Sequence, residues 1–152
     1  MGTIRSVASK TRAVRDNLPS EIENIVERLS KEIIKLNQED QLFKGLYNDG
    51  RKTPTYSQAT EEISRGTTGK GFPKEAGKPF NHYSTGELFK SIDIVFTNNK
   101  VKFFTDKPNH PFLQKKEGLA KKLFGLTKEN QQKLNYELIL PMIRKWVQST
   151  MK

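Results

Sequence analysis

The sequence contains no cysteine, so disulfide bonds and metal sites with thiolate ligands are excluded. This is compatible with a reducing compartment. No stretch approaches the roughly 20 apolar residues that a membrane-spanning helix needs, so no membrane contact is expected. Only 34% of the residues are hydrophobic and 29% are charged. That composition allows one modest core and predicts that much of the chain is surface, arm or loop.

Residues suited to catalysis are also scarce. The two histidines, His82 and His110, lie in predicted loops, and no His/carboxylate spacing predicts a zinc site. Glu61 and Glu62 are adjacent in a predicted helix, so their carboxylates point apart. The Gly-rich segment 66–71 carries glycine where a phosphate-binding loop has the Ser or Thr that holds magnesium. We therefore expect no catalytic residues, no metal site and no cofactor.

The charge is strongly positive and unevenly spread. Lys and Arg outnumber Asp and Glu by 27 to 17, a net charge of +10. Residues 17–49 nevertheless carry seven acids and four bases, whereas residues 100–152 carry twelve bases and four acids. This asymmetry suits an acidic protein surface or nucleic acid as a partner, although a solvated surface explains it equally well. The candidate contact residues are Lys70, Lys74, Lys78, Lys115, Lys116, Lys121 and Lys122.

Residues 92–105 predict a β-hairpin. Two alternating runs flank Asn98-Asn99, and because asparagine tolerates positive φ, a two-residue primed turn fits there. That turn predicts the pairs Phe96 with Val101, Ile94 with Phe103, and Ile92 with Thr105. The face that carries these residues is apolar, and the opposite face is mostly polar, with Phe104 as the exception. Two strands alone are marginal in water, so helices must cover the apolar face or further strands must join.

Helices are predicted on both sides of this hairpin. Residues 1–17 are basic and poor in large aliphatics, which predicts a disordered N-terminal arm. Residues 18–36 predict a helix that begins at a Ser20-x-x-Glu23 capping box. Its apolar stripe fits a coiled-coil seam or packing on the hairpin, and its short length favours packing; the stripe comprises Ile22, Val26, Leu29, Ile33 and Leu36. A second short helical piece is expected at residues 39–47.

The remaining elements complete an α+β prediction. Residues 57–65 predict a helix capped by Ser57, followed by a long Gly/Lys loop at 66–83. The closing helix is predicted from Thr127 to Gln148, with Pro141 kinking or splitting it and Trp146 as a core or interface anchor. The predicted fold is a small antiparallel sheet built on the hairpin and packed by the N-terminal and C-terminal helices. It forms a single domain at 18–148, with a basic arm at 1–17 and a tail at 149–152.

Two motifs resemble a known family. The run Thr85-Gly86-Glu87-Leu88-Phe89-Lys90-Ser91-Ile92 resembles the TG-x-[LF]-x-x-S-[IF] segment of tail-completion and virion-morphogenesis proteins of tailed bacteriophages. The run Leu123-Phe124-Gly125-Leu126-Thr127-Lys128-Glu129-Asn130 resembles the GLT-x-E-N run before the last helix of that family. The order of the predicted elements is similar as well, and the resemblance covers residues 18–148.

The resemblance implies a non-enzymatic structural protein of the virion. Such a protein forms a ring with copies of itself at the head–tail junction, or neck, and contacts portal, adaptor or tail proteins, with possible contact to packaged DNA. It would be assembled in the host cytoplasm and reside in the virion. Candidate interface residues are Arg5, Arg12, Arg15, Phe104 and Trp146. The alternative is a basic nucleic-acid-binding module without enzymatic activity.

Overall fold

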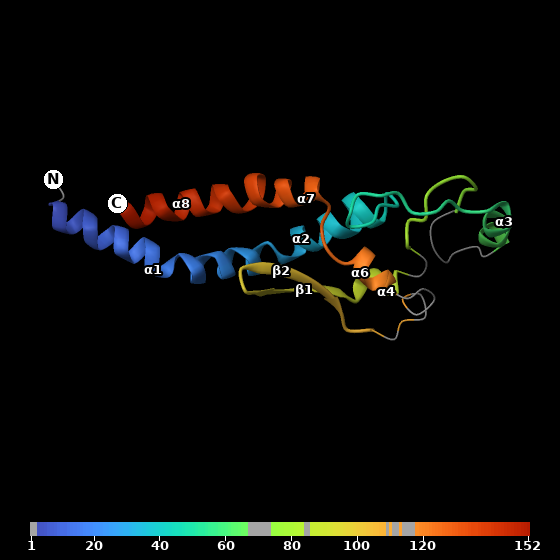
Figure 1. The fold of residues 1–152 in the computed structure, drawn as a ribbon, viewed down its shortest axis with the longest axis horizontal. Coiled ribbons are helices and arrows are strands. Elements are labelled where there is room, and N and C mark those ends of the chain that lie inside the picture. Colours follow the sequence, from blue (N-terminus) through green and yellow to red (C-terminus); the bar gives the residue numbers. More distant parts are fainter. Residues whose placement is uncertain (1–2, 67–73, 84–85, 109, 111–112, 114–117) are drawn as a thin grey trace.

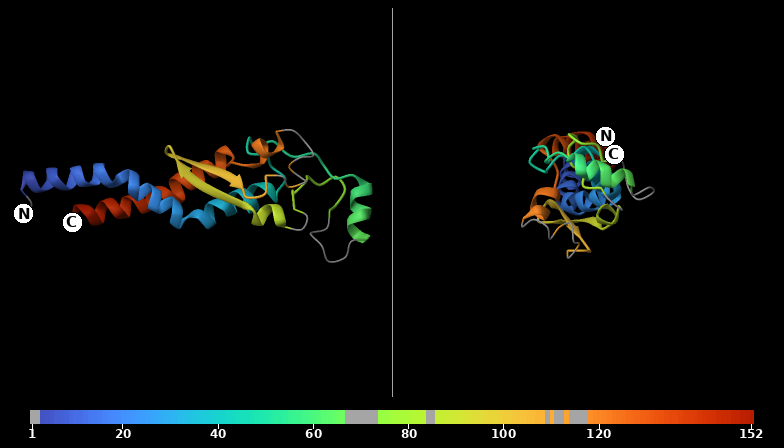
Figure 2. Two further views of the ribbon diagram at one scale, coloured as in Figure 1. Left: turned by 90° about the horizontal axis from the view of Figure 1, so that it is seen from below. Right: turned by 90° about the vertical axis from the view of Figure 1, so that its right-hand side faces the viewer.

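The computed structural model describes residues 3–66, 74–83, 86–108, 110, 113 and 118–152. The molecule is elongated, with the start of the first helix and the end of the last helix side by side at one end (Figures 1 and 2). In chain order the elements are α1 (Ile4–Arg28), α2 (Ser30–Asn37), the π-helical turn η1 (Gln38–Leu42), α3 (Gln58–Gly66), α4 (Glu87–Lys90), β1 (Ile92–Thr97), β2 (Lys100–Thr105), α6 (Leu119–Leu123), α7 (Lys128–Gln132), the π-helix η2 (Lys133–Ile139) and α8 (Leu140–Met151). These elements confirm the α+β prediction.

The hairpin forms as predicted. β1 and β2 pair antiparallel, with Ile92 opposite Thr105, Ile94 opposite Phe103 and Phe96 opposite Val101. Asn98 and Asn99 have φ values of 51° and 58°, which is the left-handed geometry of a primed turn. The side chains alternate between covered and exposed along both strands, and β2 leaves Phe104 exposed. Helices rather than further strands cover the apolar face.

The predicted disordered arm is wrong for the described residues, because α1 begins at Ile4 and runs through the whole basic segment. Thr3 caps the helix, its hydroxyl accepting the backbone N–H of Ser6. This half of α1 packs against α8, and Lys10 Nζ donates to the backbone oxygen of Met151 at 3.2 Å. A cation beside the last carbonyls of a helix is stabilising. Packing on a distant helix thus orders a segment whose own composition predicts disorder.

The boundaries of the N-terminal helices also differ from the prediction. Ser20 lies inside α1 and so does not cap it, and Pro19 lies there too. A proline ring displaces the hydrogen bond to the residue four positions earlier, and α1 is bent in Figure 2. Leu29 interrupts the helix with a ψ of 6°. The short helix expected at 39–47 is instead the π turn Gln38–Leu42, which continues α2.

Two apolar clusters make the core. One lies beneath α4 and α6 and is formed by Leu42, Leu88, Phe89, Ile92, Leu113, Leu119 and Leu123. The other joins α1, α2 and the C-terminal helix to the hairpin and is formed by Val26, Ile33, Leu36, Leu126 and Leu134, with partly buried Phe96, Val101 and Phe103 packed on it. The stripe of the N-terminal helices therefore packs on the hairpin, which confirms the favoured prediction.

The C-terminal helix begins as predicted and runs without a break past Pro141, where its geometry changes from π-helical to α-helical. The Thr127 hydroxyl accepts the backbone N–H of Asn130 at 3.2 Å, which caps α7. The chain then widens into η2 and returns to α-helical geometry at Leu140, where Pro141 occupies the first turn of α8. Proline has no backbone N–H, so the i to i−4 hydrogen bonds of the α-helix cannot continue at Pro141. The wider π-helical turn lies directly before this position. The helix ends at Met151 instead of Gln148, and Trp146 is half-buried.

The segment between η1 and α4 lies at the other end of the molecule. The Ser57 hydroxyl accepts the N–H of Thr60, which confirms the predicted cap of α3. Residues 74–83 contain neither helix nor strand but are held by isolated bridges, Thr55 with Pro79 and Tyr56 with Ala76. Residues 67–73 of the predicted Gly/Lys loop lie outside the described residues, as does Thr85 of the first motif.

Candidate interaction surfaces

A network of buried amides fixes the connector Leu123–Thr127, which carries the GLT motif. Asn37 Nδ2 donates to the backbone oxygens of Leu123 at 2.9 Å and Gly125 at 2.8 Å. Gln41 Nε2 donates to the Gly125 oxygen at 2.9 Å, and Gln41 Oε1 accepts the N–H of Thr127 at 2.8 Å. Both amide side chains are fully buried. Buried polar groups need partners, so this network holds an irregular backbone against the helices.

Two further asparagines fix the segments on either side of this connector. Asn48 Nδ2 donates to the backbone oxygens of Lys121 and Phe124 at 2.7 and 2.8 Å. Asn130 Nδ2 donates to the oxygen of Leu36 at 3.0 Å, which ties the start of α7 to α2. The motif residue Asn130 therefore positions α7 relative to the N-terminal helices, and with it one wall of a groove on this side of the hairpin.

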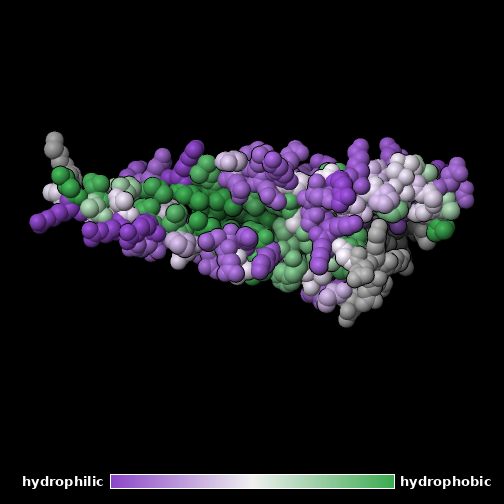
Figure 3. Space-filling view, in the orientation of Figure 1, coloured by the Kyte–Doolittle hydropathy of each residue, from purple (hydrophilic) through white to green (hydrophobic). Residues whose placement is uncertain are grey.

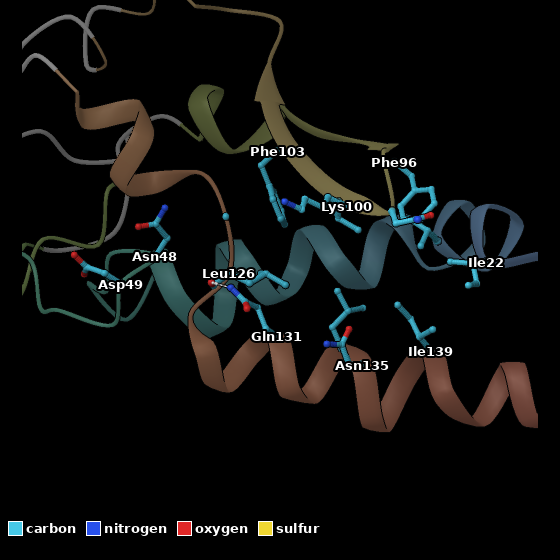
Figure 4. Close-up of a pocket in the computed structure, with 15 residues that line it drawn as sticks. Ile22, Asn48, Asp49, Phe96, Lys100, Phe103, Leu126, Gln131, Asn135 and Ile139 are labelled. Carbon is cyan, nitrogen blue, oxygen red and sulfur yellow. Dashed lines mark hydrogen bonds between the residues drawn. The ribbon is translucent and has the colours of Figure 1, made fainter. Parts of the chain in front are cut away.

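That groove, the hairpin groove, lies between β2 and the C-terminal helix over α1 (Figure 4). Its volume is about 830 Å³. The hairpin lines it with Phe96, Lys100, Val101 and Phe103; the C-terminal helix with Gln131, Leu134, Asn135 and Ile139; and α1 with Ile22 and Val26. Asp49 and Lys100 are its two charged residues among those described, and a hydrogen bond from Arg51 lowers the pKa of Asp49. The arrangement suits binding and supplies no acid–base pair.

The outer edge of β2 borders the hairpin groove. Next to a two-residue turn the Thr97–Lys100 pair is hydrogen-bonded, so the backbone groups of Val101 and Phe103 point away from β1. Within the described part of the chain, no turn or loop hydrogen bond uses these groups. On β1, by contrast, the carboxylate of Asp93 accepts the outward N–H of Ile94 at 2.8 Å. The β2 edge can therefore accept a further extended segment, whereas the β1 edge is partly blocked.

A second, smaller groove lies between α1 and the outer edge of β1. Its volume is about 350 Å³. Val26, Ile94, Val95 and Phe96 line it with apolar surface, while Glu23, Glu27 and Ser30 form its helical rim. We call this the acid-rimmed groove. Glu23 and Glu27 make no ion pair with any described residue.

At the opposite end of α1, residues 4–18 of α1 and α8 form an antiparallel pair that projects from the body (Figure 1). We call this pair the stalk. It carries six basic residues and one acid, a net charge of +5. No side chain of α8 is fully buried, and an apolar band runs along this region between hydrophilic rims (Figure 3). Ile4 is 89% exposed and Val7 50% exposed. The stalk is thus amphipathic, basic and only half covered.

The structure brings together most of the candidate interface residues. Arg5, Arg12 and Arg15 are exposed on the stalk half of α1, and Trp146 lies on α8 beside it. Phe104 is separate from them, on the outer face of the hairpin. The acid-rimmed groove was missed by sequence reasoning. The spacing of four between Glu23 and Glu27, on either side of the stripe residue Val26, is the signal that would have pointed to it.

The candidate lysines fall into two parts of the molecule. Lys74 and Lys78 belong to the segment beside α3, with Lys74 Nζ 5.8 Å from the Tyr56 ring centroid and Lys78 4.0 Å from Glu75. Lys121 and Lys122 belong to α6, with Lys122 Nζ 5.7 Å from the Tyr47 ring centroid. Lys121 is exposed. Lys70, Lys115 and Lys116 lie outside the described residues.

The buried His82 makes stability depend on pH. Burial lowers its pKa from 6.5 to about 4. As the pH falls, the unfolded chain therefore takes up this proton before the folded chain does. We expect the free energy of unfolding to decrease by about 3 kcal/mol between roughly pH 6.5 and pH 4 from this group. Urea titrations at several pH values measure it.

The matched variant for this prediction is His82→Asn. His82 has a φ of 53°, and asparagine tolerates that left-handed geometry. Carboxylates also titrate near pH 4, so the contribution of His82 is the difference between the two pH profiles. Parallel profiles for the wild type and the variant would contradict the assignment.

Comparisons with protein-family models, with curated proteins and with solved structures found no match to this chain. Among the described residues, none of the helices combines the length and the apolar character needed to cross a membrane. In the same part of the chain, no three His, Asp or Glu side chains gather into a possible metal site.

Proposed function

We propose that this chain is a structural subunit of a tailed-bacteriophage virion, assembled in the host cytoplasm into a ring at the head–tail junction. It would join the portal or adaptor to the tail by shape and repeated contact, without catalysis or a cofactor. Two motifs support this function, one leading into the hairpin and the other preceding the last helix. The second motif contains the connector held by Asn37 and Gln41, and its Asn130 bonds to α2, so it has a defined task in positioning the C-terminal helix.

The observation that carries the proposal is the amount of interaction surface that a single copy leaves uncovered. The stalk exposes Ile4 and Val7 at its outer end, and the β2 edge carries outward backbone groups beside the hairpin groove. Exposed apolar surface and open strand edges are typical of proteins that assemble. An elongated subunit with such surfaces at separate places suits a repeated structure better than a solitary enzyme.

The experiment that tests this function is quantitative mass spectrometry of purified particles of the phage that encodes the chain. We expect the chain in every preparation, at several copies per portal ring. Washing particles with high salt before the measurement separates a built-in subunit from an adsorbed basic protein. Particles that lack the chain after the wash would contradict the proposal.

A second candidate function is binding of nucleic acid, which the net charge of +10 and the exposed Lys121 favour. If α6 contacts phosphates, affinity for duplex DNA should fall steeply with salt. Replacing Lys121 and Lys122 with alanine should then reduce the slope of log K against log salt by about 2. Fluorescence anisotropy with a labelled duplex measures this. An affinity that does not respond to salt would rule the candidate out.

A further inference from the structure

The acidic side chains at the rim of the acid-rimmed groove are not paired with any described basic side chain within a single copy. Glu23 and Glu27 are four residues apart on α1, and like charges at this spacing repel one another on a helix. The carboxylate of Asp93 accepts the N–H of Ile94 at the β1 edge, one residue before the lining residue Ile94. Beneath these acids the lining is apolar, and Val95 is 46% exposed. The groove therefore suits a basic segment that also carries apolar side chains.

The stalk has the complementary character. Ile4 and Val7 are three residues apart and so share one side of α1. Arg5 and Arg12 lie on the same side of the helix, about 100° and about 80° round from Ile4, with Arg12 about two turns further along the axis. Both arginines are exposed and make no ion pair with any described residue. The tip thus presents apolar side chains flanked by guanidinium groups.

We propose that the stalk tip of one copy docks in the acid-rimmed groove of the next copy. Ile4 and Val7 would cover the apolar lining, and Arg5 and Arg12 would face Glu23 and Glu27. The inference rests on the proposed function because it names the contact by which neighbouring subunits of the ring bind one another. It requires nothing from the portal or tail proteins.

The occupant must come from another copy, because one helix carries both surfaces. Ile4 and Glu23 belong to α1 and are separated by about 28 Å of helix rise. The tip cannot fold back onto the groove without unfolding α1. A second copy can supply the same tip while its α1 stays folded. The opposite charges of the tip and the groove favour this pairing.

The geometry of this contact is head-to-tail. The tip of each copy meets a different patch on its neighbour, and such heterologous contacts generate closed rings or open filaments. A symmetric contact of stalk with stalk would instead bring together two surfaces of net charge +5. The hairpin groove is not selected by charge, since Asp49 and Lys100 balance each other there.

Reciprocal charge reversal in the full-length chain tests the proposal, with sedimentation velocity as the readout. We expect the wild type to associate at low salt. Glu23→Lys/Glu27→Lys and Arg5→Glu/Arg12→Glu should each weaken self-association by about tenfold or more. Mixing the two variants should restore association, because each then offers the surface that the other needs. One chain that carries all four changes should also associate again.

Two controls separate this contact from general effects of charge. Glu62→Lys/Glu137→Lys and Lys90→Glu/Lys128→Glu make the same charge changes at exposed positions elsewhere and should leave association unchanged. Raising the salt from about 0.05 M to about 0.5 M should weaken association of the wild type, whereas apolar stalk-on-stalk contact would persist. Circular dichroism verifies that each variant keeps its helix content.

Several outcomes would overturn the proposal. These are a wild type that stays monomeric at low salt, reversals that leave association unchanged, and a mixture that fails to recover. All these measurements use the purified chain alone. If the purified chain fails to associate in this way but is abundant in washed virions, the contact is discarded and the proposed function is retained. If the chain associates through this contact but is absent from washed virions, the contact is retained and the proposed function is discarded.

Discussion

Replacing Gln41 with leucine is expected to lower the free energy of unfolding by about 3 kcal/mol. The Gln41 side chain is fully buried, accepts the N–H of Thr127 at 2.8 Å and donates to the oxygen of Gly125 at 2.9 Å. Leucine fills similar space but leaves the buried N–H of Thr127 without an acceptor. Gly125 keeps one donor, Asn37, so the main cost falls at the start of α7. Equilibrium unfolding in urea measures the change.

A matched control is Gln132→Leu. Gln132 is exposed on α7, and its replacement should change the stability by no more than about 0.5 kcal/mol. If Gln41→Leu were as stable as the wild type, the amide network would not be what holds the GLT connector. The second motif would then have no structural task in positioning the C-terminal helix.

The second large effect is expected in the stalk. Replacing both Ile143 and Trp146 with alanine removes half-buried apolar surface from α8, the helix that packs on α1. We expect local protection of the backbone amides in residues 8–18 to fall by roughly thirtyfold, or about 2 kcal/mol. Amides of residues 33–37, in the core, should keep their protection. Hydrogen exchange followed by mass spectrometry resolves the two regions.

The control for the stalk exchanges two neighbouring exposed residues of α8. Lys145→Ala/Gln148→Ala alters the same turn on its solvent side and should leave the exchange of residues 8–18 nearly unchanged. Equal protection in both double variants would contradict the claim that α8 keeps the basic half of α1 helical. It would mean that residues 4–18 are helical on their own.

The hairpin could be predicted from sequence because its determinants are local. Alternation from Ile92 to Thr105 and the two turn asparagines define the strands, the register and the buried face without reference to distant residues. The Thr127 cap and the effect of Pro141 are local for the same reason. In each case a few neighbouring residues decide the backbone geometry.

The errors arose where distant contacts decide the structure. Residues 4–17 lack a strong helical pattern, and in the structure they pack on α8, more than a hundred residues away in sequence. Ser20 has the pattern of a cap, but packing of α1 on both sides of Pro19 overrides it. The π turns likewise follow from tertiary packing and from the proline beyond η2, which no periodicity in the sequence records.

The candidate surfaces also divide into features that follow from local sequence and features that depend on distant contacts. Charge counting identified the basic stalk residues and the acidic character of residues 17–49 as separate facts. That Glu23 and Glu27 rim an apolar groove depends on β1 lying against α1, and this placement needs the fold. The amide side chains of Asn37 and Gln41 were also missed, because polar residues on a helix are ordinarily assigned to the surface. Asn48, in the turn at 48–49, was missed as well.

A three-dimensional reconstruction of the virion by electron microscopy tests the proposed role of this chain most directly. We expect a ring of this subunit at the head–tail junction, with the stalk of each copy resting in the acid-rimmed groove of its neighbour. Density at the junction that leaves no place for this chain, or that contains it as an isolated copy without a neighbour, would contradict the central claim.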